Sequence, residues 1–349
     1  MISTLRSMRR FSASRSLAAT AEQIFAREDK YGCHNYKPLP VALAKGEGVF
    51  VWDVAGKRYY DFLASYSAVN QGHCHPRILA VNRLTSYLSC LAAIKQMQQL
   101  TLTSRAFFNN VLGEYEEFLA KKFKYDKVLP MNTGVEACES AVKLARRWAY
   151  DKKKVPQNKA KVVFAEDNFW GRSIAAVSAS TDPESYGGFG PFVPLFEKVP
   201  YNNLQALEKA ISDPNTAAFM VEPIQGEAGV VLPDDGYLKV RHVFQVIEDE
   251  GLVENSAAMG KLLMDKLRTL PKEVVPVVRG RGLFCAIIIN KKFDAWKVCN
   301  RLLKNGLLSK NTHGDIIRFT PPLCINKDQI EESSEIIIKT IHEVAAEHK

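Results

Sequence analysis

The stretch Lys127–Trp148, K-V-L-P-M-N-T-G-V-E-A-C-E-S-A-V-K-L-A-R-R-W, holds the pattern that decides the fold. An apolar run, Val128–Met131, leads into a polar turn, Asn132–Gly134, and then into apolar residues at helical spacing. This order predicts a strand, a turn and a helix. The first N–H groups of such a helix have no partner inside it, and the helix dipole adds partial positive charge there. The turn is therefore either a plain helix cap or a site for an anion such as phosphate.

Two further loops follow apolar runs that predict strands. Val162–Ala165 precedes Glu166–Ser173, E-D-N-F-W-G-R-S, and Ala217–Val221 precedes Glu222–Val230, E-P-I-Q-G-E-A-G-V. Ligands of open parallel α/β sheets bind at the edge where the strands end. The three strand-end loops therefore predict one shared site.

Two side chains in the second of these loops are suited to recognising a ring or a carboxylate. Phe169 can stack on a planar ring and Arg172 can hold a carboxylate through its guanidinium. The alternative for this pair is an aromatic core residue beside a surface arginine. Arg318 lies inside a predicted strand, where an unpaired charge is costly, so a partner carboxylate is expected.

The rest of the chain predicts a large α/β domain followed by a smaller one. Alternation around Ala55 and Gly56 predicts a hairpin within 48–66. Helices are predicted at 76–100, 203–211, 236–251, 253–270, 295–305 and 327–346, and small-domain strands at 274–278, 283–289 and 316–320, with a turn at 279–282. The expected division has four parts: a transit peptide at 1–20, an N-terminal segment at 21–66, a large domain at 67–252 and a small C-terminal domain at 253–349.

Composition limits the classes of function. The chain has 349 residues, 46% of them apolar, and no run approaches the roughly 18 apolar residues of a membrane span, so no membrane partner is expected. Its formal charge is +9, but four arginines before Glu22 supply part of it and the remainder is dispersed. No basic stripe with interleaved aromatics is present, so nucleic acid is not expected as a partner.

Residues 1–20 are rich in Arg and Ser, contain no acid, and place Leu5, Met8 and Phe11 on one helical face. This composition is typical of a mitochondrial transit peptide, which predicts a location in the mitochondrial matrix; the alternative is a disordered basic tail. Seven scattered cysteines without a Cys-x-x-Cys pair favour a reducing compartment. His73 and His75 lie in a loop without a nearby acid, so no metal site is predicted there.

These motifs together resemble the class-III, fold-type I aminotransferases that use pyridoxal 5′-phosphate, and within them the ornithine aminotransferases. The segments that carry the resemblance stand in the family's order: H-N-Y-K-P-L-P, S-Y-S-A-V-N-Q-G-H-C-H-P, L-T-L-T-S-R-A-F, V-L-P-M-N-T-G-V-E-A, N-F-W-G-R, V-E-P-I-Q-G-E-A-G-V-V, V-R-G and T-H-G-D-I-I-R-F. The resemblance covers nearly all of residues 21–346. It implies an aspartate aminotransferase-like large domain, here with a truncated parallel sheet, plus the small α/β domain.

Three residues correspond to the family's cofactor-binding positions. By this resemblance Gly134 and Val135 form the turn around the phosphate of pyridoxal 5′-phosphate, and Phe169 stacks on its ring. Family members are homodimers or larger homo-oligomers that build each active site at a subunit interface. The segment from Tyr31 to Pro40 and the loop around Tyr66 correspond to their interface contributors.

Five residues correspond to substrate-binding positions. Tyr36 and Arg172 match carboxylate binders, and Tyr66 matches the tyrosine beside the bound substrate. Glu227 and Arg318 match a pair in which the glutamate neutralises the arginine while ornithine is bound and releases it for 2-oxoglutarate. A movable charge pair lets one site accept both substrates.

Two departures from the family pattern stand out. The helical segment 76–100 is longer than the family's by about three turns. Between His242 and Val243 the family has an aspartate strand (D-E-I-Q), the Schiff-base lysine (G-K-A-L-S-G-G) and a phosphate-binding threonine, and this chain has none of them. The missing length is on the order of 80 to 90 residues. Lys261, in A-M-G-K-L-L, belongs to a small-domain helix and is not expected to replace the lysine.

Two hypotheses follow. The first is ornithine transamination with 2-oxoglutarate, giving glutamate 5-semialdehyde and glutamate. The second is a non-catalytic chain, arising as a splice product, an incomplete gene model or a pseudoenzyme that pairs with an intact subunit. The lysine moves the substrate proton and the aspartate keeps the cofactor ring protonated. No catalytic residue is therefore assigned, cofactor binding is expected to be weak and non-covalent, and the chain is expected to be inactive as it stands.

Overall fold

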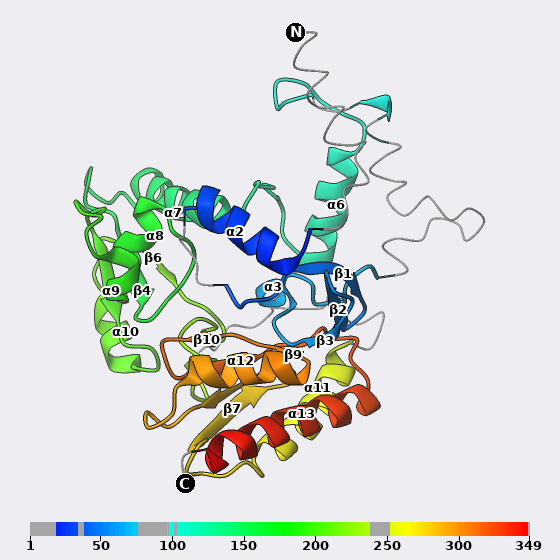
Figure 1. The fold of residues 1–349 in the computed structure, drawn as a ribbon. Helices are drawn as coiled ribbons and strands as arrows, with labels where there is room; N and C mark the ends of the chain where they lie inside the picture. The colour runs from blue at the N-terminus through cyan, green and yellow to red at the C-terminus, as the bar shows by residue number, and fades with distance from the viewer. Residues whose placement is uncertain are drawn as a thin grey trace.

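The computed structural model describes residues 19–33, 38–75, 96, 98–100, 103–237 and 252–347. Three sheets organise these residues (Figure 1). The predicted transit peptide, most of the predicted helix 76–100, the predicted helix after Gly236 and the His242–Val243 junction lie outside the described residues.

A parallel three-stranded sheet forms the centre of the large domain. Its order is β5 (Phe196–Val199), β4 (Lys161–Ala165) and β6 (Thr216–Met220). The helices of this region are α7 (Gly134–Asp151), α8 (Ile174–Ala179), α9 (Pro183–Tyr186) and α10 (Leu204–Ile211). Val142 of α7 packs with Val162 and Phe164, whereas Leu207 of α10 packs with Val163. Because both faces of β4 are covered, its sequence is continuously apolar.

Helix α7 begins where the sequence predicts, at the end of the polar turn. The hydroxyl of Thr133 accepts a hydrogen bond from the Glu136 N–H at 3.2 Å. The Glu136 carboxylate accepts in return from the N–H groups of Asn132 and Thr133, at 3.0 and 3.1 Å. This reciprocal capping box fixes the first turn of the helix.

The predicted strand Val128–Met131 is wrong. These residues have no strand assignment, and Leu129 and Met131 are 70% and 40% exposed. A strand exists only through pairing with a neighbour, and the described sheet contains β5, β4 and β6 alone. The apolar run is therefore present without a partner that would bury it.

The predicted N-terminal hairpin is confirmed, and it belongs to a sheet shared with the C-terminal half. The sheet contains β1 (Leu43–Glu47), β2 (Phe50–Asp53), β3 (Arg58–Asp61) and β9 (Leu307–Leu308) in that order. Asp53 closes the turn, because its Oδ1 accepts from the N–H groups of Ala55 and Lys57, at 2.9 Å each. Strands β3 and β9 pair in parallel.

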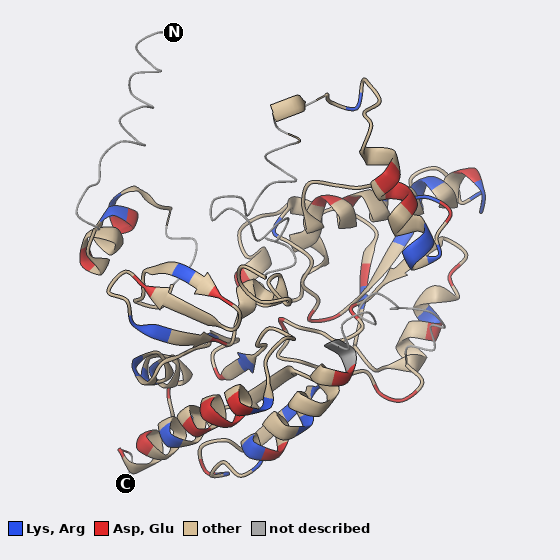
Figure 2. Ribbon diagram, turned by 90° about the vertical axis from the view of Figure 1, so that its right-hand side faces the viewer, with Lys and Arg blue, Asp and Glu red and all other residues tan. Residues whose placement is uncertain are grey.

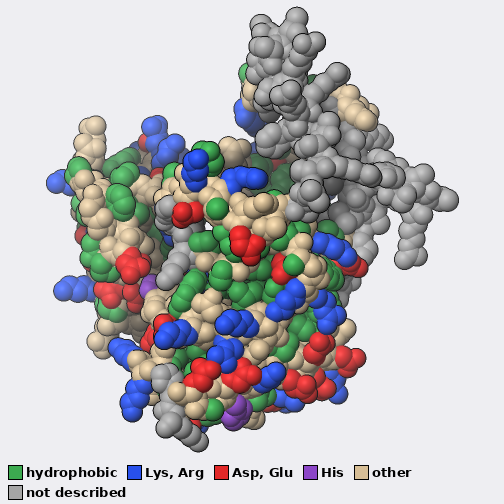
Figure 3. Space-filling view, viewed as in Figure 1, with side chains coloured by type: hydrophobic (Ala, Val, Ile, Leu, Met, Phe, Trp, Pro, Cys, Tyr) green, Lys and Arg blue, Asp and Glu red, His purple; other side chains and the backbone are tan. Residues whose placement is uncertain are grey.

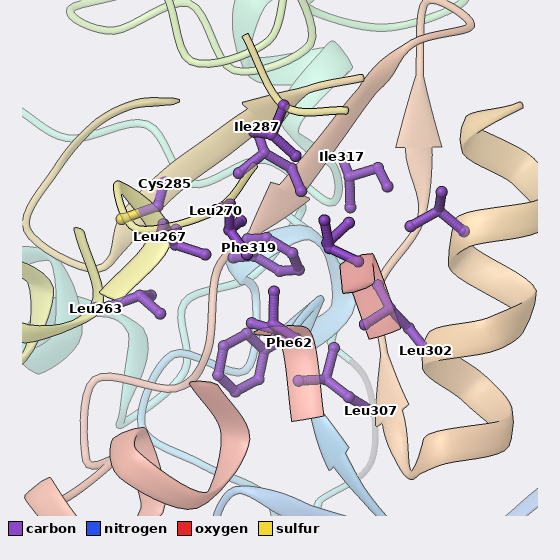
Figure 4. Close-up of a cluster of buried hydrophobic side chains, with 14 of the residues drawn as sticks. Phe62, Leu263, Leu267, Leu270, Cys285, Ile287, Leu302, Leu307, Ile317 and Phe319 are labelled. Carbon is purple, nitrogen blue, oxygen red and sulfur yellow. The ribbon is translucent and has the colours of Figure 1, made fainter. Parts of the chain in front are cut away.

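The C-terminal unit is an antiparallel sheet with helices packed against it. The sheet order is β10 (Asn311–Thr312), β11 (Ile316–Phe319), β8 (Phe284–Ile288) and β7 (Val277–Arg281), and the helices are α11 (Leu252–Leu267), α12 (Ala295–Asn305) and α13 (Lys327–Ala346). Figure 4 shows Phe62, which follows β3, among core side chains of this unit such as Phe319 and Leu307. The N-terminal segment is thus packed into the C-terminal core.

The predicted strand 274–278 and turn 279–282 are shifted. The N–H groups of Val274 and Val275 bond to the Pro271 carbonyl at 3.0 and 2.8 Å, so they are part of a turn. Strand β7 starts only at Val277 and includes Arg279. The two valines are buried, although they do not belong to the strand.

Three further helices complete the described chain: α2 (Ala21–Tyr31), α3 (Ala64–Ser67) and α6 (Leu112–Phe123). No residue of α6 is buried, and its Tyr115 and Phe118 are 52% and 60% exposed. Leu144 and Trp148 of α7 are 70% and 50% exposed. Large apolar side chains therefore face outward on both helices.

Charged residues of both signs are mixed along the described chain. Figure 2 shows Lys and Arg alternating with Asp and Glu on the helices, and Figure 3 shows the same mixture over the C-terminal unit. Among the described residues, none of the helices combines the length and apolarity needed to cross a membrane. Within the same ranges, no cluster of three or more His, Cys, Asp or Glu side chains has the arrangement of a metal site.

Candidate functional site

Glu222 joins two of the three strand-end loops. Its Oε1 accepts from the Phe169 N–H and its Oε2 from the Gly226 N–H, both at 3.0 Å. The amide of Gln225 adds a 2.6 Å bond to the Glu166 carbonyl. Burial raises the pKa of the Glu222 carboxyl, and the two backbone N–H donors partly oppose this rise. The loops after β4 and β6 are therefore one connected structure.

Gly171, in the loop after β4, lies against the turn at the start of α7, so the third strand-end loop is also part of this structure. Its φ is +144°, and a Cβ built on it would lie 2.4 Å from Cγ2 of Val135. Only glycine accepts this close approach. Nearby, the Ser173 hydroxyl donates to Glu139 of α7 at 2.5 Å. The start of α7 and the loop containing Phe169 and Arg172 are consequently in direct contact.

The start of α7 has the features of an anion site. No acceptor from the described residues meets the N–H groups of Gly134 and Val135, and a Cβ on Gly134 would find open space within 4 Å. A phosphate can therefore approach the backbone at the positive end of an 18-residue helix. Phe169, 40% exposed, supplies an aromatic face close by. The residues present fit a phosphorylated planar cofactor.

A cavity of about 440 Å³ lies beside these groups, within the usual range for small-molecule sites. Its lining residues carry rings, apolar groups and charges of both signs: Phe169, Arg172, Ile174, Val177, Asp182, Glu184, Ser185, Phe189, Glu227 and His313. Three of the predicted site residues thus share one chamber. In contrast, Trp170 is stacked on Phe164 with ring centroids 6.0 Å apart, so the core alternative holds for this neighbour.

The carboxylate partner expected for Arg318 is confirmed as Glu227. Their side chains form an ion pair with a 3.1 Å Nη2–Oε2 distance, and only 10% of the Arg318 side chain is exposed. The Thr312 hydroxyl donates to Oε1 of Glu227 at 2.6 Å. The guanidinium of Arg318 also lies 5.5 Å from the ring centroid of Tyr66. Three predicted substrate residues are therefore in one contact network.

Tyr66 reaches this position through a strained backbone. Ala64, Ser65, Tyr66 and Ser67 have φ values of 47°, 51°, 55° and 71°. Left-handed φ costs a residue with a side chain roughly 1 kcal/mol or more. Asp61 supports the segment, since its Oδ1 accepts from the Ala64 N–H at 2.9 Å. Strain of this kind is concentrated at functional sites.

Arg279 fastens the Glu222–Val230 loop to the C-terminal sheet. Its guanidinium donates to the Gly229 and Ala228 carbonyls at 2.5 and 3.2 Å. Gly229 has a φ of +93°, and a Cβ there would lie 2.5 Å from Ile316. Burial lowers the pKa of Arg279. This contact aligns Glu227 with Arg318, which lies on β11 beside Ile316.

Sequence reasoning assigned no role to Thr312, His313, Glu222 or Lys310. The T-H-G-D segment marks the first two, but it contains no charge pattern that identifies a bond to Glu227. Tyr36, a predicted substrate residue, lies outside the described residues. Lys261 is exposed on α11, in the C-terminal unit.

The site can be compared with known proteins. The sequence pattern of the class-III aminotransferases matches residues 31–242 and 239–341 of this chain. The chain belongs to the class-III aminotransferases. This membership, together with the solved structures below, confirms the predicted fold-type I class, which implies pyridoxal 5′-phosphate as the family's cofactor.

Curated relatives of this class-III aminotransferase are named as ornithine aminotransferases. A probable mitochondrial ornithine aminotransferase of Caenorhabditis elegans is 56% identical over 420 aligned positions, covering 96% of each chain. The mitochondrial enzyme of Drosophila melanogaster is 50% identical, covering 92% of each. A crystal structure of the Toxoplasma gondii ornithine aminotransferase has a TM-score of 0.87 at 35% identity, covering 97% of this chain and 98% of that one.

This chain is shorter than its relatives within the aligned region. The family pattern matches in two pieces that meet at residues 239–242. The alignment of 420 positions with the C. elegans protein exceeds the 349 residues of this chain by 71, so at least 71 positions have no counterpart here. Both observations agree with an internal segment missing near the His242–Val243 junction.

Proposed function

We propose that this class-III aminotransferase retains the substrate side of ornithine transamination but does not complete the reaction alone. The observation that carries the proposal is the Glu227–Arg318 ion pair, which lies between Tyr66 and a cavity that contains Phe169 and Arg172. Ornithine and 2-oxoglutarate are the substrates that such a switchable pair accommodates. The names of the curated relatives support this choice.

The charges of the site follow from the chemistry of the two substrates. Ornithine bears one carboxylate, which Arg172 holds by a charge-assisted bond, and its δ-ammonium is compatible with an Arg318 that Glu227 has neutralised. 2-Oxoglutarate bears a second carboxylate, for which Arg318 is released. Because the Arg318 side chain is nearly buried, its charge needs an anionic partner at all times, either Glu227 or the second carboxylate of 2-oxoglutarate.

Pyridoxal 5′-phosphate is the cofactor that the family uses, and it supplies an electron sink for the substrate carbanion when bound. In this chain the N–H groups of Gly134 and Val135 would hold its phosphate, and Phe169 would cover one face of its ring. The sequence has no counterpart of the family's cofactor lysine or ring aspartate. Binding is thus expected to be weak and non-covalent, and no side chain is assigned to move the substrate proton.

The decisive experiment combines an activity assay with chemical trapping. The chain is incubated with pyridoxal 5′-phosphate, L-ornithine and 2-oxoglutarate, and glutamate 5-semialdehyde is measured beside an intact ornithine aminotransferase. A parallel sample is reduced with borohydride, digested and mapped. We expect no product above the cofactor-only control and no lysine labelled stoichiometrically. Product formation together with one fully labelled lysine, Lys261 included, would refute the proposal.

The second candidate is a non-catalytic subunit that pairs with an intact one. The exposed apolar side chains of α6 and α7 favour it, since they form a surface that needs a cover. Its location would be the mitochondrial matrix, as the basic N-terminus predicts and as the mitochondrial relatives support. Co-expression with an intact subunit tests it. Failure to co-purify, where intact subunits pair with each other, would rule it out.

A further inference from the structure

In the proposed switch Glu227 loses Arg318 as its partner, so its carboxylate needs another cation. When Arg318 turns to a substrate carboxylate, Glu227 loses its cation while a second anion enters the site. A carboxylate left unpaired beside another would repel it and weaken binding. Thr312 holds one carboxylate oxygen at 2.6 Å, but a neutral hydroxyl does not cancel the charge.

Lys310 precedes Thr312 by two residues, and the Thr312 hydroxyl bonds to this carboxylate. His313, from the same segment, lines the first cavity together with Glu227, and Lys310 lines a second cavity of about 420 Å³ together with Tyr66. Tyr66 contacts Arg318 in turn. Lys310 is therefore near both residues of the ion pair: Thr312, two residues along the chain, bonds to Glu227, and Tyr66, which lines the same cavity as Lys310, lies against Arg318.

The electrostatics of Lys310 agree with this placement. Burial lowers the pKa of its ammonium group, attraction to Glu227 opposes that effect, and repulsion from Arg172 adds to it. The lysine thus interacts electrically with both a substrate-holding arginine and the switch glutamate.

We propose that Lys310 is the alternative counter-ion of Glu227, holding the carboxylate with Thr312 whenever Arg318 is engaged by a dicarboxylate substrate. This inference rests on the proposed function. It makes Lys310 a residue that determines specificity, because it stabilises the site with 2-oxoglutarate bound and leaves the site with ornithine bound almost unchanged.

The test is calorimetric titration of the full chain with 2-oxoglutarate and, separately, with L-ornithine. Lys310→Met is expected to weaken 2-oxoglutarate binding about tenfold, as for loss of one partly buried charge partner, and ornithine binding by less than about twofold. Lys310→Arg keeps the charge and should bind both ligands like the wild type. Lys304→Met, an exposed lysine on α12, is the matched control and should change neither affinity.

A second background separates the counter-ion role from direct contact with the ligand. In Glu227→Gln there is no carboxylate to neutralise, so adding Lys310→Met should alter 2-oxoglutarate binding by less than about twofold. A tenfold loss in that background would show that Lys310 binds the ligand itself and would overturn the inference. So would equal losses for the two ligands, or none. If the wild-type chain binds neither ligand, the proposed function fails and this inference fails with it.

Discussion

Substituting Gly171 by alanine tests the contact that brings the site together. The added Cβ would lie 2.4 Å from Cγ2 and 2.8 Å from Cβ of Val135, while its distance to Ala176, 3.7 Å, is ordinary. Overpacking of this kind costs roughly 1–3 kcal/mol. An L-residue at a φ of +144° adds about 1 kcal/mol or more. We therefore expect Gly171→Ala to lose about 3 kcal/mol of unfolding free energy.

Urea unfolding followed by circular dichroism measures this loss. Gly134→Ala is the matched control, because its Cβ meets nothing within 4 Å and its backbone has no positive φ. We expect it to change the unfolding free energy by less than about 0.5 kcal/mol. Adding Val135→Ala to Gly171→Ala removes the 2.4 Å contact but keeps the one at 2.8 Å, so recovery should be partial. Equal stability of the two glycine variants would show that the loop and α7 are not in contact.

Three further predictions concern stability and surface. Glu222→Gln tests the raised pKa: the folded carboxyl holds its proton more tightly than the unfolded one. The unfolding free energy of the wild type relative to the variant should therefore be highest below pH ~4.5 and should fall as pH rises through the folded pKa of Glu222. An unfolding free-energy difference that increases with pH would contradict this. Tyr60→Phe removes the 2.6 Å bond to Glu332 and should cost about 1–2 kcal/mol in urea unfolding, whereas no change would show the bond is dispensable. The purified chain should bind a hydrophobic dye more strongly than an intact relative, and a sharp thermal transition without dye binding would refute this.

Elements with strong local signals could be predicted from the sequence. Helix α12 spans the predicted residues because Asp294 caps its start and Gly306, with a φ of +100°, ends it. Helix α13 likewise begins after the Asn326 capping box. That Arg318 has a carboxylate partner was predicted from its place in a strand, whereas Glu227 was named as that partner only through the family resemblance. For the two helices, a residue and its near neighbours contain the whole signal.

Features that depend on distant partners could not be predicted. Val274 and Val275 have strand-like side chains, but their N–H groups bond to Pro271. The proposed role of Lys310 depends on a cavity that it shares with Tyr66, which no local pattern describes. The bond from Thr312 to Glu227 joins residues 85 positions apart. Pairing and enclosure are properties of the folded chain, so they are read from the structure.

The unpaired run Val128–Met131 links the missing segment to the remaining site. An apolar run before a helix normally forms a strand that fixes the helix start, but here Leu129 is 70% exposed. Among the described residues, the turn at the start of α7 is therefore held from the helix side, by the capping box of Thr133 and the contact of Val135 with Gly171. The family pattern matches in two pieces that meet at residues 239–242. Under the proposed function, the segment missing there would have supplied two things: the groups that carry the chemistry, and neighbours for the sheet that would hold the turn before α7 in place. Restoring a lysine alone would supply one chemical group but no neighbour for the sheet. A single substitution is therefore not expected to recover transamination.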